Sequence, residues 1–482
     1  MKKIEFLGTE CLHRLSFALF VLGLAASCQQ ELPRSPELQS PPHIQPSPTP
    51  SIPEPDPSPT PSPSREEAER EIVAYFEAQL DADAIALAPG FLYAETLREE
   101  DVTKERAYVW SLWQRANTER LERHQFANIT SDEREVVWDI PQGERIKSKL
   151  FAKGMRPEGG YPLFINLHGG GQQDTEEPWG NIINTIAWEG EVHRSHQYTD
   201  APSIYFVPRM ADDRIGRWYL LPQRNAFRRA IQLGWVSGQV DPERTYILGT
   251  SEGGYGSHRL ALFMPDYFAG AGPMAAAEPL KAAENLRNIA FGLQMGQEDK
   301  MFHRAEYAQA WQDKLAALQG LEPRDFVHRI QIEAGRGHGD INFAVMTPWL
   351  GMYKRRTYPE RVSYLYYNMT ADYAQESYVQ GVYYLDLRRL HHTPNASMFF
   401  HLERKGNEFH LTSELRSGIK VWGQLGIYID EMDLSRPIRV LHNGTEVFND
   451  LVVPSKGAMV ESLALWGDPK RIFAAKISVP IL

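Results

Sequence analysis

Residues 244–256 read Arg-Thr-Tyr-Ile-Leu-Gly-Thr-Ser-Glu-Gly-Gly-Tyr-Gly. An apolar run ends at Leu248, and Ser251 then stands between glycines just before a helical stretch. This strand–turn–helix order places a serine at a sharp turn from which its Oγ projects, and flanking glycines let neighbouring backbone approach without Cβ clashes. Unpaired N–H groups at the start of the following helix favour an anion beside that serine. The stretch therefore predicts an α/β layered fold with a nucleophile at Ser251.

A second glycine-rich turn lies upstream, where an apolar run ends at Leu167 and His168 follows. Three consecutive glycines come next: Gly169, Gly170 and Gly171. Glycines after a buried strand expose backbone N–H groups that side chains would otherwise screen, which is how donors are placed around a developing oxyanion. We expect these N–H groups, with that of Glu252, to form an oxyanion hole, and we expect His168 to brace the loop rather than to react.

Two downstream turns supply the groups that a serine nucleophile needs. Asp299 and His338 each follow an apolar, strand-like run. A serine hydroxyl attacks a carbonyl at neutral pH only with an imidazole as general base, and the imidazole needs a carboxylate to fix its tautomer. We therefore assign Ser251, Asp299 and His338 as catalytic, with Glu298 and Asp340 as alternative carboxylates.

Short apolar runs alternate with helical stretches over residues 65–355. Near-continuous apolar runs are typical of strands buried on both faces of a parallel sheet, and their alternation with helices predicts an α/β domain. The expected strands are 136–140, 163–167, 204–208, 246–248, 290–295 and 326–332. The expected helices are 65–80, 225–240, 256–263 and 304–318.

The pattern changes over residues 356–482, where short β-prone segments are separated by turns. Asn443-Gly444 between two apolar runs predicts a hairpin. Helical spacing is scarce here, so we expect an antiparallel β-sandwich accessory domain. Its expected strands are 397–402, 409–411, 424–429, 438–441, 446–449 and 472–479.

These motifs together resemble those of α/β-hydrolases of the esterase and dienelactone-hydrolase type, which are related to the prolyl-oligopeptidase-like group. The resemblance is carried by four motifs: His168-Gly-Gly-Gly, Gly249-Thr-Ser-Glu-Gly, Gly296-Gln-Glu-Asp and Gly337-His-Gly. It implies a doubly wound, mostly parallel sheet, an acyl-enzyme mechanism and no metal or organic cofactor. The order Ser251, Asp299, His338 is that of the family's triad. The tail also resembles a β-domain appended to some bacterial hydrolases of this group.

The amino terminus reads as an export signal. An uncharged run at 15–27 follows Lys2, Lys3 and Arg14, and it is too short to cross a bilayer. Leu24-Ala-Ala-Ser-Cys28 resembles a bacterial lipobox, which implies a signal peptide at 1–27 and a lipid on Cys28. An ordinary cleaved signal is the alternative.

Residues 28–64 contain many Pro-Ser and Pro-Thr pairs, which predict an extended linker. Gln29 follows the cysteine, and a residue other than Asp at this position is typical of lipoproteins that are sorted to the outer membrane. We therefore expect a protein anchored to the cell envelope, with the outer membrane as the expected site.

The net charge and the number of cysteines exclude some classes of function. The chain has 482 residues and a formal net charge of −11, which argues against nucleic acid as its main ligand. Its only cysteines are Cys11 and Cys28, so we expect neither a disulfide nor a thiolate metal site in the folded part.

The preferred function is hydrolysis of a small-molecule or polymer-linked carboxylic ester. Residues 66–130 are too few for the β-propeller that precedes most prolyl oligopeptidases, which favours an esterase over a peptidase.

Three residues of the segment after the glycine loop either line a pocket or only pack: Trp179, Arg217 and Trp218. A third alternative is an inactive surface binding protein that would stack exposed tyrosines on sugars. We expect these tyrosines to be core and interface residues instead: Tyr364, Tyr366, Tyr367, Tyr383 and Tyr384.

Overall fold

The computed structural model describes residues 64–140, 144–373 and 375–481, and residues 63–482 form one compact unit. The expected signal peptide, the lipid-modified Cys28 and the proline-rich linker lie outside the described residues. Among the described helices, none is both long enough and apolar enough to cross a membrane.

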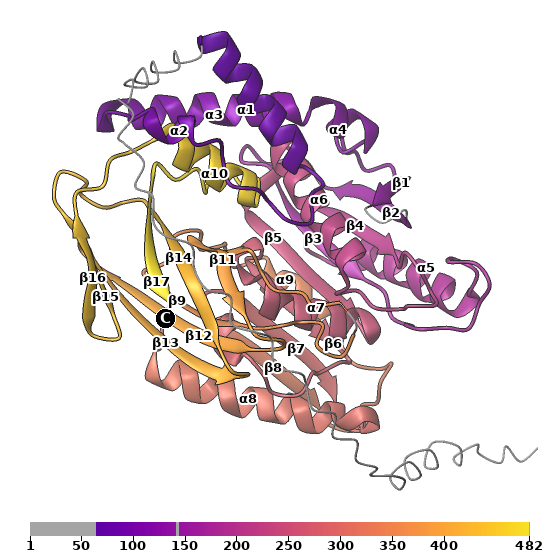
Figure 1. Ribbon diagram of the computed structural model, residues 1–482. Helices are drawn as coiled ribbons and strands as arrows, with labels where there is room; N and C mark the ends of the chain where they lie inside the picture. Colours follow the sequence, from indigo (N-terminus) through magenta and orange to yellow (C-terminus); the bar gives the residue numbers. More distant parts are fainter. Residues whose placement is uncertain (1–63, 141–143, 374, 482) are drawn as a thin grey trace, which may run out of the picture. The chain divides into compact units, whose positions relative to one another are not determined.

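A mostly parallel sheet of eight strands forms the centre of the α/β part, which lies before residue 356 (Figure 1). Its order is β1-β2-β4-β3-β5-β6-β7-β8, with β3 to β8 parallel and β1 and β2 antiparallel to their neighbours. The strands are β1 (Arg134–Ile140), β2 (Glu144–Lys153), β3 (Tyr161–Leu167), β4 (Ser203–Arg209), β5 (Val240–Thr250), β6 (Gly270–Met274), β7 (Ala290–Gly296) and β8 (His328–Glu333). This confirms the predicted doubly wound α/β architecture.

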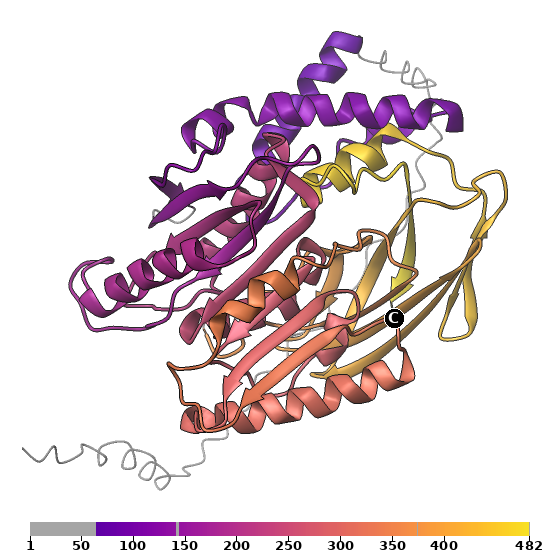
Figure 2. The ribbon, with the colours of Figure 1, turned by 180° about the vertical axis from the view of Figure 1, so that it is seen from behind.

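Helices cover both faces of this sheet. Buried side chains of α5 (Ile182–Gln197) and α9 (Met346–Leu350) pack on one face, and those of α6 (Leu221–Val236), α7 (Glu252–Phe263) and α8 (Arg304–Leu321) pack on the other. Figure 2 shows α8 alongside β8 from the opposite side. Every turn that follows a parallel strand therefore opens at one edge of the sheet, where ligand sites of this architecture form.

Helices also lie before the sheet, and α1 confirms the predicted surface helix. Its N-cap Ser64 accepts from the Glu67 N–H while the Glu67 side chain accepts from the Ser64 N–H, a capping box that fixes the start of the helix. These elements are α1 (Arg65–Gln79), α2 (Phe91–Ala94), α3 (Val102–Ala116) and α4 (Thr118–Arg123).

The C-terminal part holds two further sheets, with orders β10-β11-β14-β17 and β16-β15-β13-β12-β9. The Asn443-Gly444 hairpin is confirmed, since β15 and β16 pair antiparallel around it. Two features differ from the expectation of a purely antiparallel sandwich: β13 pairs parallel with β15, and a buried helix, α10, precedes the last strand. The elements are β9 (Arg361–Tyr366), β10 (Gly381–Val382), β11 (Leu385–His392), β12 (Ser397–Lys405), β13 (Glu408–Ser417), β14 (Val421–Ile429), β15 (Ile438–His442), β16 (Thr445–Asp450), α10 (Lys456–Trp466) and β17 (Ala475–Ile481).

The α/β part and the C-terminal part share buried contacts. The Tyr364 hydroxyl on β9 donates to the Phe263 carbonyl at the end of α7, at 2.7 Å. Figure 1 shows α10 beside α2 and α3, with which it is in contact. The boundary at 355/356 therefore stays a prediction.

Candidate active site

Ser251 occupies a strained turn between β5 and α7. Its φ of 56° and ψ of −117° lie in a region that residues with a Cβ rarely adopt. A backbone hydrogen bond to the neighbouring strand holds this turn in place: the Ser251 N–H donates to the Met274 carbonyl of β6 at 2.9 Å. The serine therefore stands at the end of the central strands, where the sequence predicts it.

The glycines around Ser251 are required by close packing. A Cβ on Gly253 would collide with the carbonyl oxygen of Leu167, and a Cβ on Gly254 would lie 2.6 Å from the Met274 carbonyl oxygen. No side chain fits at either position without displacing backbone. These two contacts pack the first turn of α7 against β3 and β6, which sets the direction of the serine.

The structure brings the three predicted catalytic side chains into one hydrogen-bonded row. Ser251 Oγ lies 3.0 Å from His338 Nε2, and His338 Nδ1 lies 2.6 Å from Asp299 Oδ2. The His338 side chain is 42% exposed whereas that of Asp299 is 2% exposed. The imidazole is therefore reachable from solvent, and the carboxylate behind it is shielded.

A residue that the sequence analysis missed completes the row. Arg304 Nη1 donates to Asp299 Oδ1 at 2.9 Å, and its Nε donates to the Tyr255 hydroxyl at 2.9 Å. Asp299 thus holds an imidazole with one oxygen and a guanidinium with the other. Its place five residues after Asp299, at the start of α8, is the only sequence signal for Arg304.

The loops that follow β7 and β8 are joined by backbone hydrogen bonds. The Glu298 N–H donates to the Arg336 carbonyl at 2.8 Å, next to the two predicted triad members. The alternative carboxylates are engaged elsewhere: Glu298 pairs with Lys300 at 2.9 Å, and Asp340 accepts from the Gly337 N–H. Asp299 is the carboxylate that meets His338.

The glycine loop after β3 passes beside the serine. A Cβ on Gly169 would lie 3.2 Å from Ser251 Cβ, so the loop and Ser251 are in contact. Among the described residues, none accepts a hydrogen bond from the N–H groups of Gly169, Gly170 or Glu252. The N–H of Gly171 differs, since it donates to Asn184 Oδ1 at 3.1 Å. Three of the four expected donors are therefore unengaged, and Gly171 instead anchors the loop to α5.

His168 braces this loop. The Met210 N–H donates to its Nε2 at 3.0 Å, so the proton lies on Nδ1, which donates to the Gly169 carbonyl at 2.6 Å. Complete burial lowers the pKa of His168 to about 3, and the neutral tautomer is therefore stable. Trp218 Nε1 donates to the His168 carbonyl at 3.0 Å and holds the loop from the other side.

A cavity of about 550 Å³ opens beside Ser251. Its volume is in the range of small-molecule sites. Its walls combine aromatic and charged side chains with the glycine loop: Gly170, Gln172, Arg217, Tyr219, Tyr255, Arg259, Glu278, Phe302, Arg304 and Tyr307. Arg217 thus lines the cavity, whereas Trp218 is buried beneath it and the Trp179 ring packs against Arg145 and Lys147.

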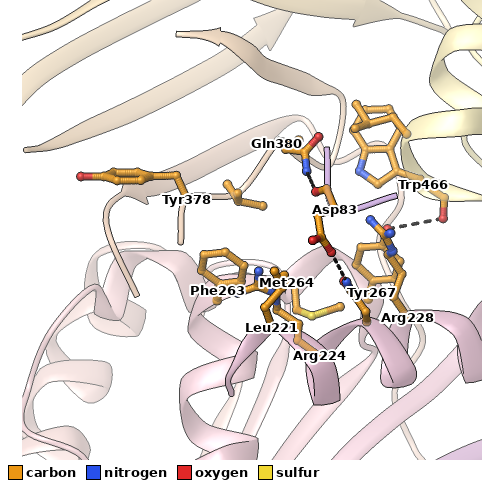
Figure 3. Close-up of a pocket in the computed structure, with 14 residues that line it drawn as sticks. Asp83, Leu221, Arg224, Arg228, Phe263, Met264, Tyr267, Tyr378, Gln380 and Trp466 are labelled. Carbon is orange, nitrogen blue, oxygen red and sulfur yellow. Dashed lines mark hydrogen bonds between the residues drawn. The ribbon is translucent and has the colours of Figure 1, made fainter. Parts of the chain in front are cut away.

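A second cavity, shown in Figure 3, lies apart from these residues. It is bounded by Asp83, α6, the end of α7, residues 378–381 and Trp466. At about 60 Å³ it is too small for an organic substrate, and it contains none of the predicted catalytic side chains. The larger cavity is therefore the candidate active site.

The tyrosines of the third alternative are not exposed. All five are at most 6% exposed and belong to the hydrophobic core. Their burial confirms the expectation that they are core residues, because alternate positions of β9 and the turn before β11 face the interior. Within the described residues, no group of three or more His, Cys, Asp or Glu side chains is placed to hold a metal ion.

Comparison with known proteins gives a partial match. No family model matches the chain. NocK of Nocardia uniformis subsp. tsuyamanensis, a protein described as an esterase, is 32% identical over 171 residues, which is 34% of this chain and 46% of NocK. The chain thus spans less than half the length of this curated relative.

Solved structures give a weaker likeness. A thermostable esterase is 21% identical with a TM-score of 0.37, over 46% of this chain and 63% of that one. Porphyromonas gingivalis dipeptidyl peptidase 4 is 13% identical with a TM-score of 0.32, over 49% of this chain and 37% of that one. At TM-scores below 0.5 these likenesses carry no argument.

Proposed function

We propose that this protein is a serine hydrolase that cleaves carboxylic esters through an acyl-enzyme. The observation that carries the proposal is the row Ser251–His338–Asp299, with contacts of 3.0 and 2.6 Å. The local similarity to NocK supports an ester as the bond cleaved.

In the proposed mechanism, His338 Nε2 takes the proton from Ser251 Oγ as the oxygen attacks the ester carbonyl. Asp299 holds the opposite ring nitrogen and stabilises the imidazolium that forms. His338 then gives the proton to the leaving alcohol, and the same nitrogen activates the water that hydrolyses the acyl-enzyme.

The developing oxyanion is stabilised by unengaged N–H groups. We assign this role to the N–H groups of Gly169, Gly170 and Glu252. Gly169 and Glu252 adjoin Ser251, Gly170 lines the same cavity, and none of the three N–H groups donates to another described residue. The strained turn at Ser251 aims Oγ between these donors and the imidazole.

A fluorophosphonate probe tests the nucleophile. We expect wild type and the Ser111→Ala control, which removes an exposed hydroxyl on α3, to be labelled and to hydrolyse p-nitrophenyl esters. Ser251→Ala should lose labelling and at least 10³-fold in kcat, roughly the loss seen when a triad nucleophile is removed. Labelling of Ser251→Ala at the wild-type rate would overturn the proposal.

Ester and peptide substrates separate the two hydrolase candidates. The purified full chain would be offered p-nitrophenyl esters of several chain lengths and proline-containing peptide p-nitroanilides. Turnover of esters is expected, and cleavage of the anilides without ester turnover would make the protein a peptidase instead.

We further propose that Cys28 carries a lipid that anchors the protein to the bacterial envelope, on the strength of the lipobox-like sequence before it. Metabolic labelling with an alkyne fatty acid should mark the wild-type chain and not Cys28→Ser. Equal labelling of both chains would contradict the anchor.

A further inference from the structure

The candidate active site gathers positive charge in a chain whose net charge is −11. Arg217, Arg259 and Arg304 line the cavity beside Ser251. An adjoining cavity of about 180 Å³ shares the Arg259 wall and adds Lys281. The carboxylates that line the two cavities are Glu252, Glu278 and Asp372, so four cations face three carboxylates.

Two of the three arginines donate hydrogen bonds of 2.9 Å or less to a carboxylate. Arg304 is bound to Asp299, as described above. Arg259 donates from Nε and Nη2 to the two oxygens of Glu278, at 2.6 and 3.1 Å. Such paired contacts neutralise both groups and leave them as structural walls of the cavity.

Arg217 differs from these two arginines. Its contacts hold the guanidinium in place but do not neutralise its positive charge. Its Nε donates to the Tyr373 hydroxyl at 3.1 Å, and its Nη1 donates to the Gly216 carbonyl at 2.8 Å. Its Nη1 lies 3.4 Å from Glu252 Oε2, which is longer than a charge-assisted hydrogen bond. Its Nη2 makes no hydrogen bond to any described residue, and the side chain is 28% exposed.

Glu252 is a weak counterion for Arg217. Its Oε1 is buried without a partner among the described residues, and burial raises the pKa of this carboxyl to about 7. At neutral pH a large fraction of Glu252 is therefore uncharged, and Arg217 keeps its positive charge.

Arg217 also lies next to the reacting centre. A Cβ on Gly171 would be 3.5 Å from Arg217 Nη1 and 3.3 Å from Glu252 Cγ, so the guanidinium lies against the predicted oxyanion loop. Arg217 and Ser251 line the same cavity, and its volume of about 550 Å³ has room for a short acyl or alkyl chain between them.

We propose that the substrate is an ester whose acyl or leaving group ends in a carboxylate, and that Arg217 binds this carboxylate. The inference rests on the proposed esterase function. A guanidinium held by two neighbours presents its remaining N–H groups in a fixed direction, which suits a planar carboxylate. Tyr373, from the segment after β9, positions Arg217, so the C-terminal part contributes to specificity.

Matched esters test the proposal with the full chain. For the acyl side, p-nitrophenyl mono-adipate is compared with p-nitrophenyl hexanoate and p-nitrophenyl 6-aminohexanoate, which have the same chain length but different charge. For the leaving-group side, 6-acetoxyhexanoate is compared with hexyl acetate. We expect kcat/KM at low salt to favour the carboxylate member of at least one pair by about tenfold or more.

Variants link the preference to one side chain. Arg217→Gln should bring that ratio close to one, mainly through KM for the carboxylate ester. Arg416→Gln removes an exposed arginine on β13 that pairs with Glu414 at 3.0 Å, and it should keep the wild-type ratio. A ratio that falls equally in both variants would mean that overall charge, and not Arg217, sets the preference.

The remaining outcomes are distinguishable. Turnover of the neutral esters without preference for either carboxylate ester would overturn the inference and leave the esterase proposal intact. Fastest turnover of the aminohexanoate ester would also overturn it, because Glu252 would then be the binding group. Absence of turnover of every ester, together with absent fluorophosphonate labelling, would remove the esterase proposal itself.

Discussion

At the scale of single residues, the candidate site depends on protonation states that the surroundings impose. Asp299 is buried between His338 and Arg304, so its carboxylate has a positive or hydrogen-bond-donating partner at each oxygen. His168 is also buried, and it is neutral because burial lowers its pKa to about 3. The same kind of side chain thus has two roles: His338 is the proposed base, and His168 braces the loop.

Asp299→Asn tests the carboxylate assignment at this scale. An amide keeps the shape of the side chain but does not stabilise the imidazolium, so kcat for esters should fall by roughly 10³ to 10⁴. Circular dichroism should show an unchanged fold. Glu298→Gln is the matched control, since this neighbour pairs only with Lys300 in the loop, and its kcat should stay within about twofold. The reverse result would assign catalysis to Glu298.

At the scale of elements, the start of α7 is determined by the strands beneath it. Gly253 contacts the carbonyl oxygen of Leu167 on β3, and Ser251 is tied to Met274 on β6. One packing arrangement therefore sets three things: the position of α7, the strained backbone at Ser251 and the direction of its Oγ. A shift of α7 would move the nucleophile away from His338.

Gly253→Ala tests this arrangement. The added methyl group cannot fit beside the Leu167 carbonyl, so we expect a loss of roughly 1 to 3 kcal/mol in the free energy of unfolding and a loss of most esterase activity. Gly190→Ala is the control. Gly190 lies within α5 with open space around its Cβ position, so this alanine should stabilise the protein by about 0.5 to 1 kcal/mol. Equal activity of both variants would contradict the packing argument.

At the scale of the whole molecule, a buried ionic network joins the α/β part and the C-terminal part. Asp468 accepts from Arg355 Nη1 and from Arg471 Nε, both at 2.6 Å, and Arg471 also pairs with Asp266 before β6. These contacts hold the pKa of Asp468 at about 2 in spite of burial. Groups on both sides of residue 355 therefore share one set of buried charges.

Asp468→Ala should weaken the whole molecule, because it leaves the buried Arg355 guanidinium without its carboxylate and leaves Arg471 with Asp266 alone. We expect a loss of about 3 to 5 kcal/mol in the free energy of unfolding, with intrinsic fluorescence and ester turnover lost in one transition. Asp450→Ala, on an exposed strand end, should change stability by less than about 0.5 kcal/mol. Two separate transitions in wild type would show that the parts unfold independently.

Buried histidines give the protein a pH-dependent stability. His258 lies in the core against Phe291 and Trp311, and desolvation lowers its pKa to about 3. Below pH 6.5 the unfolded chain takes up a proton at this ring while the folded chain does not until about pH 3. The free energy of unfolding therefore falls as pH falls through this window.

His258→Phe should remove this sensitivity at one position. Between pH 7.5 and pH 5 the wild type should lose about 2 kcal/mol more stability than the variant, at about 1.4 kcal/mol for each pH unit below 6.5. Urea unfolding at both pH values measures the difference. Parallel losses in the two proteins would mean that His258 is not neutral in the fold.

Elements with strong local signals can be predicted from the amino-acid sequence alone. Apolar runs gave most of the central strands, and the glycine-flanked Ser251 and the Asn443-Gly444 hairpin depend on backbone conformations that glycine favours. The sequence also placed Ser251, Asp299 and His338 after three strands, and parallel strands bring such turns to one edge of a sheet.

Other elements carry no such local signal. β2 alternates charged residues, the short β6 is rich in glycine, and α10 is buried all around and so lacks a polar face. Gly272 of β6 is fixed by its neighbours, since a Cβ there would lie 2.6 Å from Met346 Cγ of α9.

The packing of the folded chain determines which polar groups face one another. It placed Arg304 behind Asp299, engaged the Gly171 N–H with Asn184 and brought Tyr373 against Arg217. The physical reason is that hydrogen bonds and buried charges depend on distance in space, which segments far apart in the sequence acquire only when the sheets and helices pack.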